Sequence, residues 1–324
     1  MPFDPSRHRL GGCLFEDSPT PAPQVTTTAS SDSFPQYVDL RSMCSPVENQ
    51  GQVGSCAANA VVGALEFHQR MQKQPLVDLS RLFVYYNSRR LADNEKSDVG
   101  TFIHHVMASV MAYGACSEAM WPYIEAMWST KPTEACYREA MNVQGLTYAR
   151  ADLGPACLAV LAEGLPVVFG ACIPGEMIQV EAALTGRIET PQGPWPEPGG
   201  GHAMLVVGYD LAQKMWLIRN SWGTDWGDGG HAWVSFDVMS RYGMPSQFWT
   251  IGAIQPTQRL MMSGPSVSES VQTVRASAPA TARSVLQGMG AFKQGLRTEL
   301  ESNIQRTRSD IRNRLRGPGA GGGY

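Results

Sequence analysis

The chain has 324 residues, of which 43% are hydrophobic and 17% are charged, and its formal net charge is -3 at pH 7. A chain of this length and composition can bury a large core, which excludes a largely disordered protein and predicts a soluble globular one. The near-neutral charge indicates no whole-chain attraction to nucleic acid or membranes, and no apolar run approaches the length of a transmembrane segment.

Residues 1–34 are rich in proline, threonine and serine, which predicts an extended and weakly ordered leader. The first ten residues lack the apolar stretch and small-residue cleavage site of a Sec-type signal peptide. A cytoplasmic location and export by another route therefore both stay open.

Residues 35–256 are dense in apolar and aromatic side chains and change character halfway. Their first half predicts helices after Cys56, where Ala60, Ala64, Leu65, His68 and Met71 share one face, and at 80–90 and 101–113. Their second half predicts strands at 165–172, 203–209, 215–219 and 231–236. The order predicts an α+β domain whose helical lobe and β-rich lobe face each other across a cleft.

The C-terminal part predicts a flexible Ser/Ala/Pro linker at 257–282 and a basic amphipathic helix with a Gly-rich tail at 283–324. From Arg275 onward nine Lys/Arg and three Asp/Glu give a charge of +6, which leaves -9 for the rest. A docked or solvated helix, a self-association or partner helix through 285–315, and an anionic membrane or nucleic acid are the alternatives, and we predict no specific nucleic-acid partner.

Three short motifs, in this order along the chain, indicate a catalytic site. They are Asn-Gln-Gly-Gln-Val-Gly-Ser-Cys-Ala at 49–57, Gly-His-Ala at 201–203 and Asn-Ser-Trp-Gly at 220–223. A thiol at a helix start, an imidazole and an orienting amide form a Cys-His-Asn set for attack on a carbonyl. We therefore predict Cys56 as nucleophile, His202 as general base and acid, Asn220 as the residue that orients His202, and Gln50 as an oxyanion donor. The free amides of the helix start and a nearby imidazolium are expected to favour the Cys56 thiolate.

These motifs resemble the papain family of cysteine proteases, and in particular its bacterial members. The resemblance begins at Phe34-Pro35-Gln36-Tyr37-Val38-Asp39-Leu40-Arg41 and covers the chain to about Ile254. It implies a papain-like two-lobed fold, a polypeptide substrate and peptide-bond hydrolysis through an acyl-enzyme on Cys56. It also implies that Trp222 shields the bond between His202 and Asn220 from water.

The chain departs from the family pattern at Val53 and Ala57, where the family usually has cysteine and tryptophan. Partners for at least two family disulfides are missing, so the seven cysteines are expected to be mostly free thiols, as in a reducing compartment. Because only 34 residues precede Pro35, we expect the large helical prosegment of the family to be absent as well. Leu14-Phe15 beside Gly11-Gly12 could instead act as a tethered inhibitory plug, and a leader without any effect is the alternative.

The resemblance further suggests which residues contact the substrate. We expect the substrate-binding residues to be Gly100, Thr101, Phe102, Gly170, Gly201, Ala203 and Trp222. Small residues at 170 and 203 predict a pocket for a bulky apolar or aromatic side chain. The spacing of cysteines and histidines predicts no metal site, and we expect no cofactor.

Three other functions remain open from the sequence alone. The same triad could cleave isopeptide bonds, for example to remove a ubiquitin-like modifier. A catalytically silent papain fold could serve as a binding protein, although the intact set of four site residues disfavours it. An adaptor that works through its basic tail is the third alternative.

Overall fold

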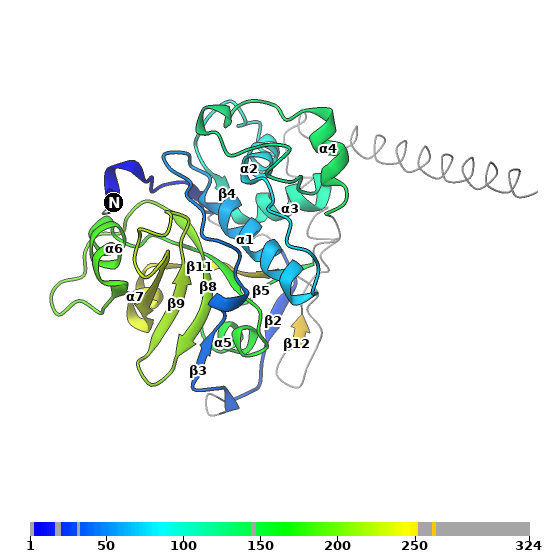
Figure 1. Cartoon of the computed structure of the whole chain (residues 1–324). Helices are drawn as coiled ribbons and strands as arrows, with labels where there is room; N and C mark the ends of the chain where they lie inside the picture. Colours follow the sequence, from blue (N-terminus) through cyan, green and yellow to red (C-terminus); the bar gives the residue numbers. More distant parts are fainter. Residues whose placement is uncertain (1–2, 17–20, 31–32, 144–146, 252–260, 264–324) are drawn as a thin grey trace, which may run out of the picture.

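The structure is a computed structural model that describes residues 3–16, 21–30, 33–143, 147–251 and 261–263. Helices gather in one lobe and a large sheet forms the other, as Figure 1 shows. The predicted α+β class is therefore confirmed. Most of the predicted linker and all of the predicted basic helix lie outside the described residues.

The helical lobe is built around α1 (Cys56–Met71), which packs against α2 (Arg81–Arg90) and α3 (Ile103–Tyr113), while α4 (Glu134–Ala140) belongs to the same lobe. Helix α1 is buried on all sides from Cys56 to Phe67, because it lies between its neighbouring helices and the sheet. Side chains of Ser80 and Thr133 cap α2 and α4 by accepting backbone N–H bonds. The short 3-10 helices η3 (Arg41–Met43) and η4 (Glu125–Met127) lie in the connections.

The β-rich lobe is one sheet with the order β12-β2-β5-β11-β6-β8-β9-β10-β7, and β3 pairs with β8 beside that path. The strands are β2 (Gln24–Thr26), β3 (Tyr37–Asp39), β5 (Tyr148–Arg150), β6 (Val167–Ala171), β7 (Arg187–Ile188), β8 (His202–Asp210), β9 (Met215–Arg219), β10 (His231–Ser235), β11 (Gly243–Ile251) and β12 (Met261–Ser263). Strand β8 is apolar from Ala203 to Val207 because it is buried on both faces. Ala203, Leu205 and Val207 join the core beneath α1, whereas Met204 and Val206 join the core on the other face.

Helices also cover the face of the sheet that points away from α1. They are α5 (Pro155–Ala162), the π-helix η5 (Glu176–Glu181), α6 (Ala182–Thr185) and α7 (Phe236–Tyr242). Residues of α5 and α7 belong to the second core, so the sheet is buried on both faces. The sequence analysis predicted neither these helices nor strand β11, which forms the pairing partner of β6.

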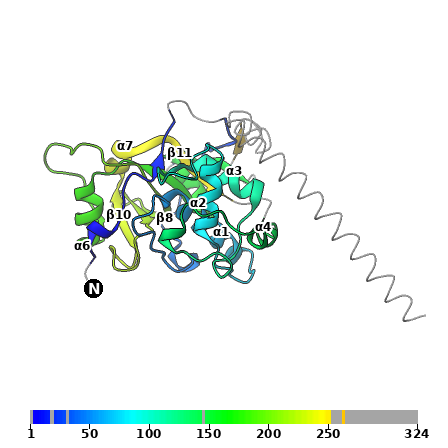
Figure 2. The ribbon, with the colours of Figure 1, turned by 90° about the horizontal axis from the view of Figure 1, so that it is seen from above.

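The leader is more ordered than its composition predicted. It contains η1 (Pro5–Arg7), and its strand β1 (Cys13–Leu14) pairs in parallel with β4 (Thr101–Phe102) of the helical lobe. Farther along, β2 joins the main sheet beside β5. In Figure 2 the leader starts beside α6 and passes between the β-rich lobe and the helices. Backbone pairing with two distant strands supplies hydrogen bonds that composition cannot reveal.

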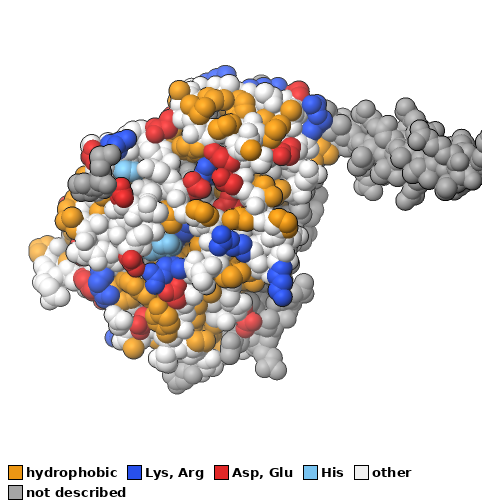
Figure 3. All heavy atoms as spheres, viewed as in Figure 1, with side chains coloured by type: hydrophobic (Ala, Val, Ile, Leu, Met, Phe, Trp, Pro, Cys, Tyr) orange, Lys and Arg blue, Asp and Glu red, His pale blue; other side chains and the backbone are white. Residues whose placement is uncertain are grey.

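Charged side chains of both signs are interspersed over the face drawn in Figure 3, in keeping with the near-neutral net charge. Within the described residues, no helix combines the length and apolar character needed to cross a membrane.

Candidate active site

Cys56 is the first residue of α1 and is completely buried. The preceding segment folds back on itself, because Val53 N–H donates to the carbonyl of Gln50 and Ser55 N–H donates to the carbonyl of Val53. This turn presents the thiol at the end of the helix where backbone N–H groups lack helical partners. The predicted position of the thiol at a helix start is thus present in the structure.

His202 and Asn220 lie at the ends of adjacent antiparallel strands. His202 opens β8, and Asn220 directly follows β9. Nε2 of His202 lies 2.8 Å from Oδ1 of Asn220, which also accepts the Ser221 N–H at 2.8 Å. Since that atom accepts from a backbone donor, it is the amide oxygen, and Nε2 of His202 must carry the proton. Nδ1 of His202 has no hydrogen-bond partner among the described residues, which leaves its lone pair for proton transfer.

The indole of Trp222 covers the imidazole of His202. Their ring centroids are 4.8 Å apart with an interplanar angle of 32°, and Trp222 is 1% exposed. His202 and Asn220 are themselves only 1% and 3% exposed. The role of Trp222 in shielding their hydrogen bond stays a prediction.

Burial controls the protonation of the two reacting groups in this arrangement. It raises the pKa of the Cys56 thiol to about 11, although N–H groups of Ala203, Ala57 and Cys56 itself oppose that rise. It lowers the pKa of His202 to about 4, against the opposing effect of the Asn220 bond. Both shifts favour the neutral forms of the thiol and the imidazole. The expected helix-start stabilisation of the thiolate is present but is outweighed by the loss of water.

Gln50 is fully buried and is held by both lobes. Its Nε2 donates to the carbonyl of Val53 at 3.1 Å, and its Oε1 accepts from Oγ of Ser221 at 2.6 Å. One N–H of the side-chain amide remains for another acceptor. Ser221 was not predicted as part of the site, because no local pattern links it to a residue 171 positions earlier.

The leader crosses the site at Gly12. A Cβ atom at this position would lie 2.7 Å from the carbonyl oxygen of Gly54 and 3.0 Å from Sγ of Cys56, so only glycine fits. The N–H groups of Gly11 and Cys13 both lie 3.0 Å from the carbonyl oxygen of Gly201. Leader backbone is thus hydrogen-bonded beside the nucleophile.

The expected substrate-binding residues line the path of the leader. The Thr101 N–H donates to the Gly12 carbonyl at 3.0 Å, the backbone of Gly12 packs against Gly100, and Phe102 pairs with Leu14.

On the opposite side of the leader, the ring of Phe15 lies against Gly170 and Gly201. Ala203 is the β-sheet partner of Gly170. The ring centroids of Phe3 and His8 lie 6.0 and 5.9 Å from the ring centroid of Trp222. Six of the seven expected residues therefore contact the leader, and Ala203 lies beside one of them. Their role in substrate binding stays a prediction.

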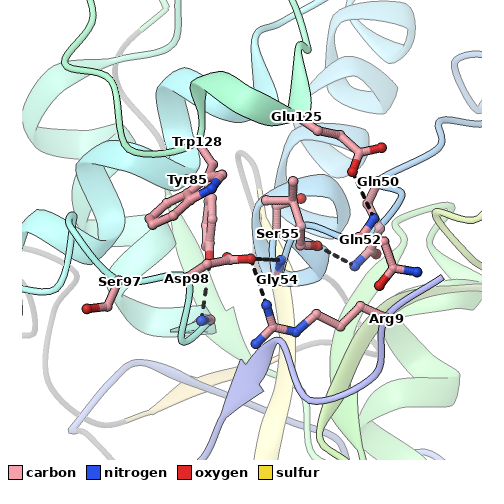
Figure 4. Close-up of polar contacts among 12 residues, drawn as sticks. Arg9, Gln50, Gln52, Gly54, Ser55, Tyr85, Ser97, Asp98, Glu125 and Trp128 are labelled. Atoms are coloured by element: carbon pink, nitrogen blue, oxygen red, sulfur yellow. Dashed lines mark hydrogen bonds and ion pairs between the residues drawn. The ribbon is translucent and has the colours of Figure 1, made fainter. Parts of the chain in front are cut away.

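A carboxylate beside the nucleophile was not predicted. Asp98 accepts the Gly54 N–H at 3.1 Å and the Tyr85 hydroxyl at 2.5 Å, and its other oxygen pairs with Arg9 of the leader at 2.6 Å (Figure 4). Asp98 and Gly54 are 44 residues apart, so the sequence carried no signal that joins them.

All seven cysteines carry free thiols, as expected. No group of three or more His, Cys, Asp or Glu side chains in the described part of the chain is arranged to hold a metal ion.

Comparison with known proteins identifies the family. Residues 34–250 match the papain family cysteine protease domain. The crystal structure of xylellain, a cysteine protease from Xylella fastidiosa, is similar with a TM-score of 0.68 and 31% identity, over 77% of this chain and 98% of that one. An uncharacterized peptidase C1-like protein of Acanthamoeba polyphaga mimivirus is 31% identical over 217 residues, which are 63% of this chain and 68% of that protein. Ananain of Ananas comosus is 27% identical over 72% of this chain and 64% of its own length.

These matches confirm the resemblance and the papain-like fold that the three motifs predicted. The chain belongs to the papain family of cysteine proteases and is a cysteine-type peptidase.

Proposed function

We propose that the protein hydrolyses peptide bonds through a covalent acyl-enzyme on Cys56. The observation that carries this proposal is the His202–Asn220 hydrogen bond of 2.8 Å, whose imidazole turns its unprotonated Nδ1 away from Asn220. The strand that begins at His202 contacts α1, and the N–H of Ala203 interacts with the Cys56 thiol. A nucleophile, a base and a residue that orients the base are the parts that such chemistry requires.

In the proposed mechanism, the Cys56 thiol gives its proton to Nδ1 of His202, and the sulfur attacks the substrate carbonyl carbon. The free N–H of the Gln50 side chain stabilises the oxyanion that forms. The imidazolium then protonates the leaving amine, and the C–N bond breaks to leave a thioester on Cys56. His202 next accepts a proton from water, whose oxygen attacks the thioester and releases the acid and the thiol.

We also propose that the leader inhibits the enzyme in the same chain. Three features support this: glycine at position 12 packs against the thiol, Phe15 lies beside Gly170 and Gly201, and burial raises the pKa of the thiol. A segment tethered to the domain has a high effective concentration, so weak contacts suffice to keep the cleft occupied.

Two substitutions test the leader proposal in the full chain. Gly12→Val would place carbon atoms against Gly54 and Cys56, so it should expel the leader and raise kcat/KM for every small peptide. Gly193→Val is the matched control, because a Cβ there meets no described atom within 4 Å and should leave kcat/KM unchanged. Equal activity in both variants and the unaltered chain would leave the leader without an inhibitory role.

Active-site titration tests the catalytic proposal. An epoxide inhibitor of papain-type enzymes should label the Gly12→Val chain with one equivalent per molecule, and the further substitution Cys56→Ala should abolish labelling. A failure to label would favour the silent-fold alternative. Parallel peptide and isopeptide substrate panels distinguish the proposed peptidase from an isopeptidase.

A further inference from the structure

The carboxylate of Asp98 lies beside the nucleophile on the helical lobe. Oδ1 of Asp98 accepts the Tyr85 hydroxyl at 2.5 Å and the Gly54 N–H at 3.1 Å. Tyr85 in turn accepts the Gly100 N–H at 3.1 Å. Asp98 therefore joins the loop that precedes Cys56 to the segment along which the leader pairs.

The backbone of Gly54 contacts both this carboxylate and the leader residue that packs against the sulfur of Cys56. The position of a Cβ at Gly54 is 3.1 Å from Oδ1 of Asp98, while the Gly54 carbonyl faces Gly12 next to Sγ of Cys56. A side chain that projects from a polypeptide bound over Cys56 can thus reach Asp98.

A cation of this chain already occupies that place. Nη1 of Arg9 lies 2.6 Å from Oδ2 of Asp98, and their side chains are 31% and 18% exposed (Figure 4). The Arg9 backbone N–H also bonds the Gly51 carbonyl at 3.3 Å. Arg9 must leave with the rest of the leader before a substrate can enter, and its departure exposes Oδ2 of Asp98.

The buried cation Arg89 is already committed to other partners. The guanidinium of Arg89 lies 3.9 Å from the centroid of the Tyr85 ring, and it donates to backbone carbonyls that include Ser97 at 2.8 Å. Glu125 lies on the neighbouring turn, where it accepts the Gln52 N–H at 3.2 Å, whereas the ion pair of Arg9 is with Asp98. The departure of Arg9 therefore leaves the Asp98 carboxylate without its cation.

We propose that Asp98 is a specificity-determining residue that selects an arginine or lysine side chain of the polypeptide substrate beside the bond to be cleaved. Arg9 is then the built-in occupant of this subsite. The proposal rests on the peptidase function proposed above, and it adds the class of substrate. An ion-paired hydrogen bond at a partly buried site is strong enough to discriminate between otherwise equal peptides.

The test compares two peptides that differ only by arginine or glutamine at the residue next to the cleaved bond. It uses the full chain, because the fraction of molecules with an open cleft multiplies kcat/KM equally for both peptides and cancels in their ratio. The unaltered chain should prefer arginine. Asp98→Asn keeps an acceptor for Gly54 and should lower the arginine-to-glutamine ratio by about 10- to 100-fold. Its rate on the glutamine peptide should hold or rise, since Arg9 loses its partner.

Glu125→Gln is the matched control, since it neutralises a neighbouring carboxylate and should leave the ratio within about twofold of its original value, as expected for a surface charge. An unchanged ratio in Asp98→Asn, with epoxide labelling of Cys56 intact, would overturn the subsite while the peptidase function stands.

A binding measurement distinguishes failure of the proposed Asp98 subsite from failure of the proposed peptidase function. In Cys56→Ala, equilibrium binding of the same two peptides needs no turnover. Tighter binding of the arginine peptide that disappears on adding Asp98→Asn supports the subsite even if the chain proves inactive. Equal affinities for the two peptides would contradict it.

Discussion

The two lobes contribute to the site in different ways. The helical lobe supplies Cys56 and Gln50 from one short run of sequence, and the turn before α1 is enough to bring them together. The β-rich lobe supplies His202 and Asn220 from separate strands, and their 2.8 Å contact depends on the register between β8 and β9. The proposed nucleophile is therefore positioned by its own stretch of chain, whereas the proposed base is oriented by the sheet.

A few contacts join the two contributions. Ser221 bonds Gln50 through its side chain at 2.6 Å, and its carbonyl accepts the Gln50 N–H at 2.8 Å. Arg219 of β9 bonds Oγ of Ser45 at 3.2 Å. A change in either lobe is therefore expected to alter catalysis through different contacts.

The largest expected effect comes from removing the reacting groups themselves. Cys56→Ala and His202→Ala, placed in the Gly12→Val chain to open the cleft, should each abolish turnover by about six orders of magnitude, because nucleophile and base act as a unit. Steady-state kinetics on a fluorogenic peptide measures the loss, and an unchanged melting temperature excludes unfolding. Substantial turnover in either variant would contradict the proposed roles.

Removal of the oxyanion donor from the helical lobe should have the next largest effect. Gln50→Ala should lower kcat by roughly 100- to 1,000-fold with little change in KM, because the donor acts on a charge that exists only in the transition state. Gln50→Glu serves as a control of similar size that retains the acceptor for Ser221 but lacks the N–H. A kcat close to normal for Gln50→Ala would remove this residue from the mechanism.

Loss of the orienting amide in the β-rich lobe should cost less. Asn220→Ala removes one hydrogen bond to His202 and should lower kcat by roughly 10- to 100-fold, because the imidazole can still transfer protons when it is misaligned. Asn220→Asp keeps an acceptor at the same place and should recover part of the rate. If Asn220→Ala were as inactive as His202→Ala, the separation between transfer and orientation would be wrong.

The smallest effect should appear in the pH dependence of stability, and it should come from both lobes. Burial lowers the pKa of His105 in α3 to about 3 and the pKa of His231 in β10 to about 4. In the unfolded chain both histidines take up a proton near pH 6.5, whereas in the folded chain they stay neutral to lower pH. The free energy of unfolding should therefore be unaffected by these histidines above pH 6.5 and should decrease as the pH falls toward 4.

The slope of the unfolding free energy against pH between 7 and 4 is the measurement. His105→Gln should make that slope shallower than in the unaltered chain, whereas substitution of the exposed Lys96 should not. If the slope for His105→Gln equals that of the unaltered chain, this histidine does not remain neutral in the folded protein.

Local features of the chain were predictable because their causes are local. The predicted helix at 80–90 became α2, and the predicted strand at 215–219 has the bounds of β9, since apolar periodicity and turn residues act over a few positions. The short motifs around Cys56, His202 and Asn220 indicated both the family and the fold. The catalytic and substrate-binding roles of these residues remain predictions.

Tertiary structure alone decided how the leader, Asp98 and Ser221 reach the site. The leader has the composition of a weakly ordered segment, yet it gains order from pairing with β4 and β5 on two different lobes. Asp98 meets Gly54 across 44 positions and Ser221 meets Gln50 across 171. A single polar contact between distant residues leaves no periodic trace in the sequence. It depends on how α1 packs against α2 and against the sheet, and not on the neighbours of either residue.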